Sequence, residues 1–242
     1  VIGFCEPELV AAAPKLQWIQ IGSAGLNGCL VGPDYPRKDI LLTNMQRVQS
    51  AQIAEHAIAM ALTLARGLDL AVQRQADGRW DKSIAAADRP WTLAGRTLLV
   101  VGLGGIGTEV ARRAHGLGMR VVATRNSSRA GPDFVETVGL ADELPDLIGE
   151  ADVVVNAAPL TAATAGLFDA ALIARMKRGA LFINVGRGAS VDTAALIAAL
   201  ESGALGGAGL AVTDPEPLPA AHPLWRAPNV VITPYIASTS ED

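Results

Sequence analysis

Aromatic residues make up only 4% of the 242-residue chain, and charged residues only 18%. Half of the residues are hydrophobic, which excludes a disordered chain and provides enough apolar surface for one large or two modest domains. The net charge is −4, and no basic run occurs. We therefore expect neither a nucleic acid nor an anionic membrane surface as a partner.

Long hydrophobic runs are also missing. A membrane-spanning helix needs about 18 uncharged apolar residues, and the longest candidate, residues 58–72, is interrupted by Arg66 and Asp69. The first residues, VIGFCEP, resemble a strand that has already begun and not a secretory leader. We expect the sequence to be part of a longer chain without a signal peptide.

Cysteine is scarce, with Cys5 and Cys29 as the two examples. The two thiols could pair, but the simpler interpretation is two reduced cysteines in a cytoplasmic protein. We predict no metal site.

From residue 97 onward, short apolar runs alternate with segments of helical spacing. Strands are predicted at 97–101, 120–123, 152–156, 180–184, near 208–212 and at 229–233. Helices are predicted at 106–117, around 142–149, and at 169–179 and 192–203. Strands that alternate with helices indicate βαβ units and a parallel sheet that is covered on both faces.

The first half of the chain has a different pattern. Strands are predicted at 1–4, 16–23 and 39–44, and a long helix at 51–76 with a kink at Gly67. We predict an α/β fold with two domains. Residues 51–233 form a doubly wound dinucleotide-binding (Rossmann) domain that includes the long helix, and residues 1–50 form a smaller, incomplete α/β domain towards which residues 234–242 return.

The sequence VVGLGGIGTEVA (100–111) contains Gly102, Gly104 and Gly107 in GxGxxG spacing. The motif follows a predicted strand and opens a predicted helix, which is the context that dinucleotide binding requires. Gly102 allows a tight turn, Gly104 lets a pyrophosphate approach, and Gly107 lets helix and strand pack closely. Gly105 and Ile106 offer N–H groups at the helix N-terminus. The alternative is a glycine-rich turn without a ligand.

The end of the next predicted strand favours NADP over NAD. An NAD site places Asp or Glu near position 125, whereas this chain has Thr124, Arg125, Asn126, Ser127 and then Arg129. A guanidinium group beside hydroxyl and amide donors suits a 2′-phosphate. NAD stays possible, because these arginines could instead be solvated loop residues.

Five segments, in this order, resemble the D-isomer-specific 2-hydroxyacid dehydrogenases of the glyoxylate and hydroxypyruvate reductase type. They are residues 23–30, 52–68, 92–114, 183–203 and 214–234. The resemblance covers nearly the whole chain. It implies an NAD(P)-linked oxidoreductase of small 2-oxo or 2-hydroxy acids, with two domains and a homodimer built around the long helix.

The resemblance also implies roles for individual residues. Arg187 matches the arginine that holds the carboxylate and carbonyl of the substrate, and Glu216 matches the acid that orients a catalytic imidazole. The backbone at Ala24 and Gly25 matches the loop that binds the substrate carboxylate. Further cofactor contacts are implied at Ala158, Pro159, Thr164, Val185, Gly186 and Ala211.

Two positions depart from the family pattern. Tyr235 in TPY stands where the family has the catalytic histidine, and Ala211 in GLAV stands where it has aspartate. The three histidines, His56, His115 and His222, lie in other segments and are predicted to be packing or loop residues.

The departures leave two functional hypotheses open. A tyrosine hydroxyl, with an ordinary pKa of about 10, can donate a proton during reduction but is a poor base for oxidation. The first hypothesis is an NADP-linked 2-oxo acid reductase with Tyr235 as the acid. The second is a catalytically impaired relative that binds a dinucleotide as a sensor or interaction module. We place the reductase first, because Arg187, Glu216 and the carboxylate loop are retained.

Overall fold

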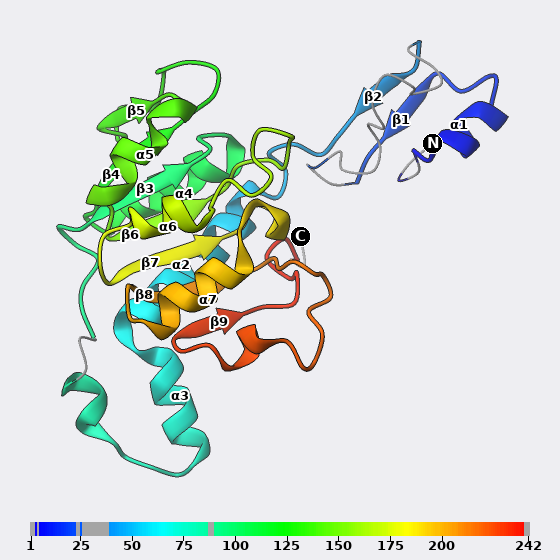
Figure 1. Cartoon of the computed structure of the whole chain (residues 1–242). Coiled ribbons are helices and arrows are strands. Elements are labelled where there is room, and N and C mark those ends of the chain that lie inside the picture. Colours follow the sequence, from blue (N-terminus) through cyan, green and yellow to red (C-terminus); the bar gives the residue numbers. More distant parts are fainter. Residues whose placement is uncertain (1–2, 4, 23–24, 26–38, 87–89, 240–242) are drawn as a thin grey trace. The chain divides into compact units, whose positions relative to one another are not determined.

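The computed structural model describes residues 3, 5–22, 25, 39–86 and 90–239 (Figure 1). Contacts within the chain divide it into two compact units, Val1–Ser50 and Ala51–Asp242. Residues 234–239, which we expected to return towards the small domain, group with the second unit, and Ala237 packs against its hydrophobic core. Among the described residues, no helix is long and apolar enough to cross a membrane.

The first unit contains helix α1 (Pro7–Ala12) and the parallel strands β1 (Trp18–Gln20) and β2 (Leu41–Thr43). The predicted strand at 1–4 lies almost entirely outside the described residues. The expectation of a reduced Cys5 is wrong, because Cys5 is buried and disulfide-bonded. The described residues of this unit form a small core around Cys5, Val10, Ile19, Ile21 and Ile40, which gains from a covalent link that restricts the unfolded chain. Cys29 lies outside the described residues.

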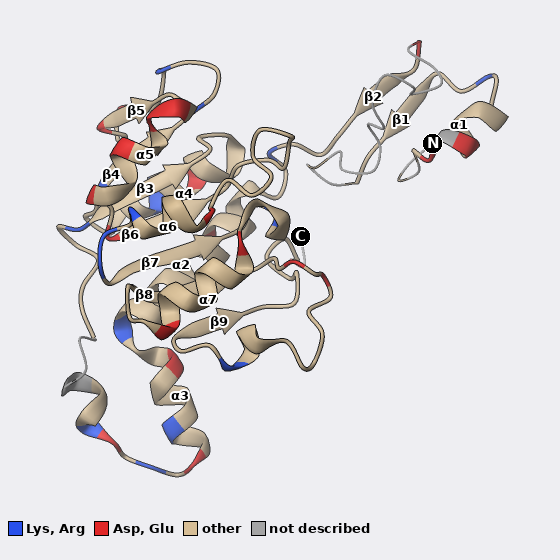
Figure 2. Ribbon diagram, in the orientation of Figure 1, with Lys and Arg blue, Asp and Glu red and all other residues tan. Residues whose placement is uncertain are grey.

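The second unit is built on a seven-stranded sheet in which every strand pair is parallel, in the order β5-β4-β3-β6-β7-β8-β9. The strands are β3 (Thr97–Val101), β4 (Arg120–Thr124), β5 (Thr137–Gly139), β6 (Val153–Asn156), β7 (Ala180–Asn184), β8 (Leu205–Leu210) and β9 (Val230–Ile232). The order reverses between β3 and β6, which confirms the predicted doubly wound fold. Strands β6 to β9 carry no charged residue (Figure 2).

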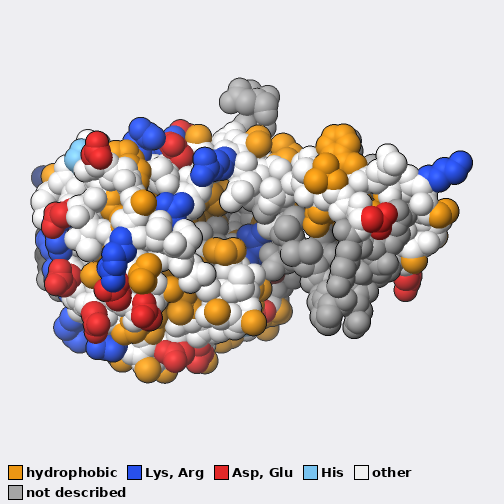
Figure 3. Space-filling model, turned by 90° about the horizontal axis from the view of Figure 1, so that it is seen from above, with side chains coloured by type: hydrophobic (Ala, Val, Ile, Leu, Met, Phe, Trp, Pro, Cys, Tyr) orange, Lys and Arg blue, Asp and Glu red, His pale blue; other side chains and the backbone are white. Residues whose placement is uncertain are grey.

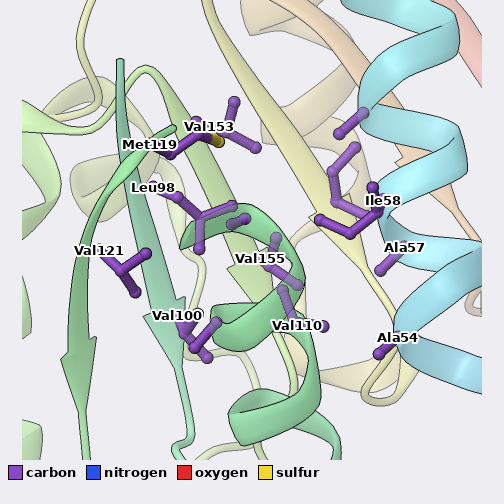
Figure 4. Close-up of a cluster of buried hydrophobic side chains, with 14 of the residues drawn as sticks. Ala54, Ala57, Ile58, Leu98, Val100, Val110, Met119, Val121, Val153 and Val155 are labelled. Carbon is purple, nitrogen blue, oxygen red and sulfur yellow. The ribbon is translucent and has the colours of Figure 1, made fainter. Parts of the chain in front are cut away.

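Helices cover both faces of this sheet. They are α2 (Ser50–Arg66), α4 (Gly105–Gly116), α5 (Leu144–Leu147), α6 (Ala170–Ala174) and α7 (Thr193–Glu201), whereas α3 (Leu68–Ala76), which follows α2, has no buried residue. One hydrophobic cluster joins α2 and α4 to the sheet, and a second joins α5, α6 and α7 to it. Figure 4 shows the first cluster, in which Ala57 and Ile58 of α2 point towards the side chains of the sheet. The predicted kink at Gly67 is a break between α2 and α3, with Gly67 in the left-handed conformation at φ 65°.

Small residues on β8 let α2 approach the sheet closely. A Cβ atom added to Gly209 would lie 2.8 Å from Met60 Cβ, and one added to Gly207 would lie 3.1 Å from Leu64 Cδ2. Met60 precedes Leu64 in α2, whereas its partner Gly209 follows Gly207 in β8, so the helix and the strand run in opposite directions. The N-terminal half of α2 therefore lies towards the carboxyl end of the sheet.

Asp152 anchors the opposite, amino end of the sheet. Its carboxylate accepts hydrogen bonds from Lys177 Nζ at 2.7 Å, from Arg96 Nη1 at 3.2 Å and from the Thr97 backbone N–H at 2.9 Å. Burial opposes its ionisation, but the hydrogen bonds from Lys177 and Thr97 hold the pKa of Asp152 below its ordinary value of 3.8. The carboxylate therefore ties β3 to β6 and to the segment that precedes β7.

We expect Asp152→Ala to lower the free energy of unfolding by about 1–3 kcal/mol, because it removes the acceptor of the Thr97 N–H and of two half-exposed cations, Lys177 and Arg96. The depressed pKa makes this stabilisation complete above pH 3.8 and lost as the pH falls through the folded-state value. Denaturant unfolding at pH 7 and at low pH measures both effects. Asp146→Ala is the matched control, since that side chain is 82% exposed beside Arg175 and is worth less than about 0.5 kcal/mol. Equal losses in the two variants would contradict the assignment.

Candidate active site

The three glycines of the loop between β3 and α4 have different surroundings. Gly102 has φ 95°, and a Cβ atom there would lie 2.8 Å from the Ala158 backbone nitrogen. At Gly107 an added Cβ would overlap the Gly102 carbonyl oxygen and lie 2.8 Å from Val100 Cγ1. At Gly104 it would meet nothing within 4 Å. Packing therefore requires Gly102 and Gly107, whereas Gly104 faces open space.

This open space is a suitable place for a pyrophosphate. Helix α4 begins at Gly105, so the N–H groups of its first turn have no partner within the helix and form its positive end. The loop after β6 lies across the strand-order reversal, where Thr164 Oγ1 donates to the Pro159 carbonyl at 2.6 Å. These residues fit the diphosphate of a dinucleotide. Among the described residues, no cluster of side chains could hold a metal ion.

The two arginines after β4 differ in their partners. Arg129 Nη1 forms an ion pair with Glu143 Oε2 at 2.8 Å, and the hydrogen bond that Arg129 donates to Glu143 raises the pKa of Arg129. Arg125 Nη1 donates at 3.0 Å to the carbonyl of Ala130, which is uncharged. Arg125 therefore retains a positive charge that no described carboxylate neutralises. Thr124 is buried, whereas Asn126 and Ser127 are exposed beside Arg125.

A buried hydrogen-bond network holds the turn that carries Arg187. Asn156 Nδ2, at the end of β6, donates to Asn184 Oδ1 at 3.0 Å and to Ser190 Oγ at 2.8 Å. Asn184 Nδ2 and Ser190 Oγ in turn donate to the Arg187 carbonyl at 3.1 and 2.6 Å. All three side chains of the network are buried. The backbone of Arg187 is therefore fixed from two strands, whereas its side chain is partly exposed.

The loop of Glu216 packs directly against this turn. A Cβ atom on Gly188 would overlap the carbonyl group of Thr213 and lie 2.6 Å from the Asp214 nitrogen. The Thr213 N–H donates to Glu216 Oε1 at 3.4 Å, which holds the carboxylate over the start of its own loop. Glu216 is exposed and lies beyond the carboxyl end of β8.

Tyr235 follows β9 in a constrained turn. Its φ is 58°, which is uncommon for a bulky residue, and its N–H donates to the Thr233 carbonyl at 2.9 Å. The side chain is 49% exposed, so Tyr235 is not a core packing residue. Backbone strain that persists at such a position is typical of functional turns.

Strand order brings the predicted catalytic residues to one edge. Arg187, Glu216 and Tyr235 follow β7, β8 and β9, which are parallel neighbours, and the glycine loop follows β3 at the same edge. Val185, Gly186 and Ala211, the remaining predicted cofactor contacts after β7 and β8, are buried there. Ala24 lies outside the described residues, and Gly25 belongs to the first unit. The carboxylate-binding loop therefore stays a prediction.

His56, which was predicted to be a packing or loop residue, also lies at this edge. Its Nε2 lies 2.8 Å from Thr233 Oγ1, at the end of β9, and burial lowers the pKa of His56. The other two histidines have the structural roles that were predicted. His115 is exposed and stacks on Phe134 with ring centroids 5.9 Å apart, and His222 Nδ1 accepts the Leu224 N–H at 3.2 Å. The four-residue spacing of His56, Met60 and Leu64 could have placed His56 on the face that contacts the sheet.

A glycine loop at the strand-order reversal, with an open helix N-terminus and polar groups at the same edge, is the arrangement of a dinucleotide-binding protein. Comparison with protein families identifies the family to which the chain belongs. The NAD-binding domain of the D-isomer specific 2-hydroxyacid dehydrogenases matches residues 58–237, and the chain belongs to this family.

The relatives agree with this assignment. The chain is 37% identical over 235 residues to a glyoxylate/hydroxypyruvate reductase B of Citrobacter koseri, covering 97% of this chain and 72% of the relative. A D-isomer specific 2-hydroxyacid dehydrogenase from Xanthobacter autotrophicus, solved with NADPH and MES, has a TM-score of 0.81 and 34% identity, covering 95% of this chain and 71% of the other. An NADPH-dependent glyoxylate/hydroxypyruvate reductase from Sinorhizobium meliloti, solved with NADP and sulfate, has a TM-score of 0.83 and 30% identity, with 99% and 75% covered.

These findings confirm the resemblance and the fold, and they identify the protein as a member of a family of 2-hydroxyacid dehydrogenases. They favour an enzyme over a non-catalytic dinucleotide-binding module. Whether Tyr235 supports turnover is a question for the chemistry of the site.

Gly104→Ala is expected to weaken NADPH binding at least about tenfold while leaving thermal stability unchanged, since the methyl group enters the space for the pyrophosphate and touches no protein atom. Titration of the dinucleotide, followed by fluorescence or calorimetry, measures the dissociation constant. Gly116→Ala is the matched control, because it adds a methyl group into open space at the other end of the same helix. Indistinguishable affinities of the two variants would show that Gly104 does not face the cofactor.

Proposed function

We propose that this protein uses NADPH to reduce a small 2-oxo acid of the glyoxylate or hydroxypyruvate class. The observation that carries the proposal is the buried network of Asn156, Asn184 and Ser190, which holds Arg187 at the sheet edge beside the glycine loop. The similarity to glyoxylate/hydroxypyruvate reductases supports the substrate class.

The preference for NADP is assigned to Arg125. No acidic residue stands at this position to accept hydrogen bonds from a ribose 2′-hydroxyl, and the guanidinium is bonded only to a neutral carbonyl among the described residues. Arg129, which we predicted as a second phosphate ligand, is already paired with Glu143. We therefore assign the 2′-phosphate mainly to Arg125, with Asn126 and Ser127 as neutral donors.

In the proposed reaction Arg187 binds the substrate carboxylate and polarises the carbonyl group. The bound nicotinamide supplies a hydride to the carbonyl carbon. Tyr235 donates its hydroxyl proton to the developing alkoxide and recovers a proton from solvent, which its exposure permits. Glu216 has no imidazole to orient in this chain, so its role is limited to accepting hydrogen bonds beside Arg187. This arrangement favours reduction over oxidation.

The proposed organisation assigns residues 1–50 to the substrate domain, with Ala24 and Gly25 binding the carboxylate, and residues 51–233 to the cofactor domain. A homodimer is proposed through α3, which has no buried residue and projects from the rest of its unit (Figure 1). Val72 on α3 is 64% exposed and the nearby Trp80 is 93% exposed. A cytoplasmic location is kept as an expectation, although the disulfide at Cys5 removes the argument from reduced thiols.

An NADPH-oxidation assay with glyoxylate, hydroxypyruvate and pyruvate tests the activity, and Tyr235→Phe tests the acid. We expect turnover of at least one of the three acids, and a fall in kcat of about 10²–10⁴-fold in the variant with an unchanged dissociation constant for NADPH. Tyr235→His restores the residue usual in the family and is expected to raise the rate. Absence of turnover in all three proteins would favour a dinucleotide-binding module.

Arg125→Ala is expected to weaken NADPH binding about 10–100-fold with little effect on NADH, because it removes the cation assigned to the 2′-phosphate. Arg129→Ala is the matched control, since its charge is already neutralised by Glu143, and we expect less than about a threefold change. Dissociation constants for both dinucleotides decide the question. Tighter binding of NADH than of NADPH by the unmodified protein would overturn the preference.

A further inference from the structure

Helix α2 contributes a polar side chain to the turn that carries Tyr235. His56 Nε2 lies 2.8 Å from Thr233 Oγ1, although the two residues are 177 positions apart in the sequence. Thr233 is held by the sheet through its N–H, which donates to the Leu210 carbonyl at 3.0 Å. The Thr233 carbonyl in turn accepts the N–H of Tyr235 at 2.9 Å. A continuous chain of hydrogen bonds therefore runs from His56 through Thr233 to the backbone of Tyr235.

The packing of α2 on β8 explains why His56 reaches this place. Leu64 packs over Gly207 and Met60 over Gly209, so each helical turn of four residues matches two residues of the strand. One further turn brings His56 to the level of Ala211, which is buried in the same cluster. The side chain of Ala211 has no polar group. At this level the polar group comes from His56 on α2.

The face of α2 that contacts the sheet changes from apolar to polar towards the N-terminus of the helix. Leu64 and Met60 are buried apolar side chains, whereas His56 and Gln52, one turn further, are polar. Gln52 Oε1 is buried and makes no hydrogen bond within the described part of the chain. An acceptor without a partner beside an active-site edge is consistent with a donor that arrives with a ligand.

We propose that His56 is a positioning residue of the active site, which acts through the Thr233 hydroxyl to hold the turn of Tyr235. The inference rests on the proposed function, in which Tyr235 is the proton donor. The left-handed conformation of Tyr235 makes such support necessary, because a bulky residue at φ 58° does not keep this conformation by itself. The imidazole therefore serves the reaction from α2 and not from the loop after β9.

The protonation state of His56 controls this contact. Burial lowers the pKa of His56 from 6.5, so the ring is neutral at pH 7. In this state Nε2 can accept a hydrogen bond from the Thr233 hydroxyl. The adjacent Glu55 is paired with Arg113 at 2.9 Å, and Glu109 binds both Arg113 and Arg112. These charges compensate one another on α2 and α4, and Tyr235 is the titratable group on the turn. Protonation of His56 below pH 6.5 turns Nε2 from an acceptor into a donor, which reverses this hydrogen bond and leaves the Thr233 hydroxyl proton without its acceptor.

The first test compares His56→Leu and Thr233→Val with Thr233→Ser, which keeps the hydroxyl. We expect each of the first two variants to lower kcat about tenfold with an NADPH dissociation constant within about twofold, and the double variant to be no slower than either. Thr233→Ser is expected to retain the rate.

A fall of kcat below pH 6.5 in the unmodified protein is expected to disappear in His56→Leu. The exposed His115, changed to Leu, is the matched control for loss of an imidazole.

The second test does not depend on turnover. The chain has only two tyrosines, so ¹³C-labelled tyrosine gives two ring signals, and Tyr235→Phe assigns them. We expect the Tyr235 signal to follow the titration of His56 below pH 6.5 and to lose this response in His56→Leu and Thr233→Val. A Tyr235 signal that ignores both changes would overturn the proposal even if the protein is an active reductase. A coupled signal in a protein without turnover would instead reject the proposed function and leave the positioning role in place.

Discussion

The active-site edge depends on the hydrogen bonds that Asn156 makes to Asn184 and Ser190. Buried amide and hydroxyl groups are costly unless every donor finds an acceptor, and here the satisfied arrangement requires the backbone of Arg187 to be in one place. The network crosses from β6 to β7, so it joins the strand-order reversal to the turn of Arg187. Loss of one member would leave the others buried without partners.

A second constraint is the contact between α2 and β8. Glycine at two alternate positions of β8 brings a helix close to the sheet that would otherwise be held off by side chains. The cost is a weaker strand, which is offset by hydrogen bonds to β7 on one side and to β9 on the other. The gain is that one end of α2 reaches the carboxyl edge of the sheet with His56.

On the face shown in Figure 3, acidic and basic side chains of the second unit are interspersed, so neither sign of charge dominates this surface.

Much of the architecture could be predicted because its signals are local. The strands from β3 to β9 are apolar runs, with the exception of the three-residue edge strand β5, and the GxGxxG spacing of Gly102, Gly104 and Gly107 lies within one βαβ unit. The missed features join distant segments. His56 and Thr233 meet only after α2 has packed on β8, and the pairing of Arg129 with Glu143 crosses from the β4 loop to the turn after β5. Neither pairing leaves a periodic pattern in the sequence.

The close approach of Gly188 to Thr213 has a consequence for variation in this enzyme. The turn of Arg187 and the loop of Glu216 touch backbone to backbone, so neither can change length or accept a side chain at the contact without moving the other. Substitutions in the two loops are therefore coupled, although about 25 residues separate the loops in the chain. Variants selected for a new substrate should alter them together, or should leave both intact and change the surfaces around them.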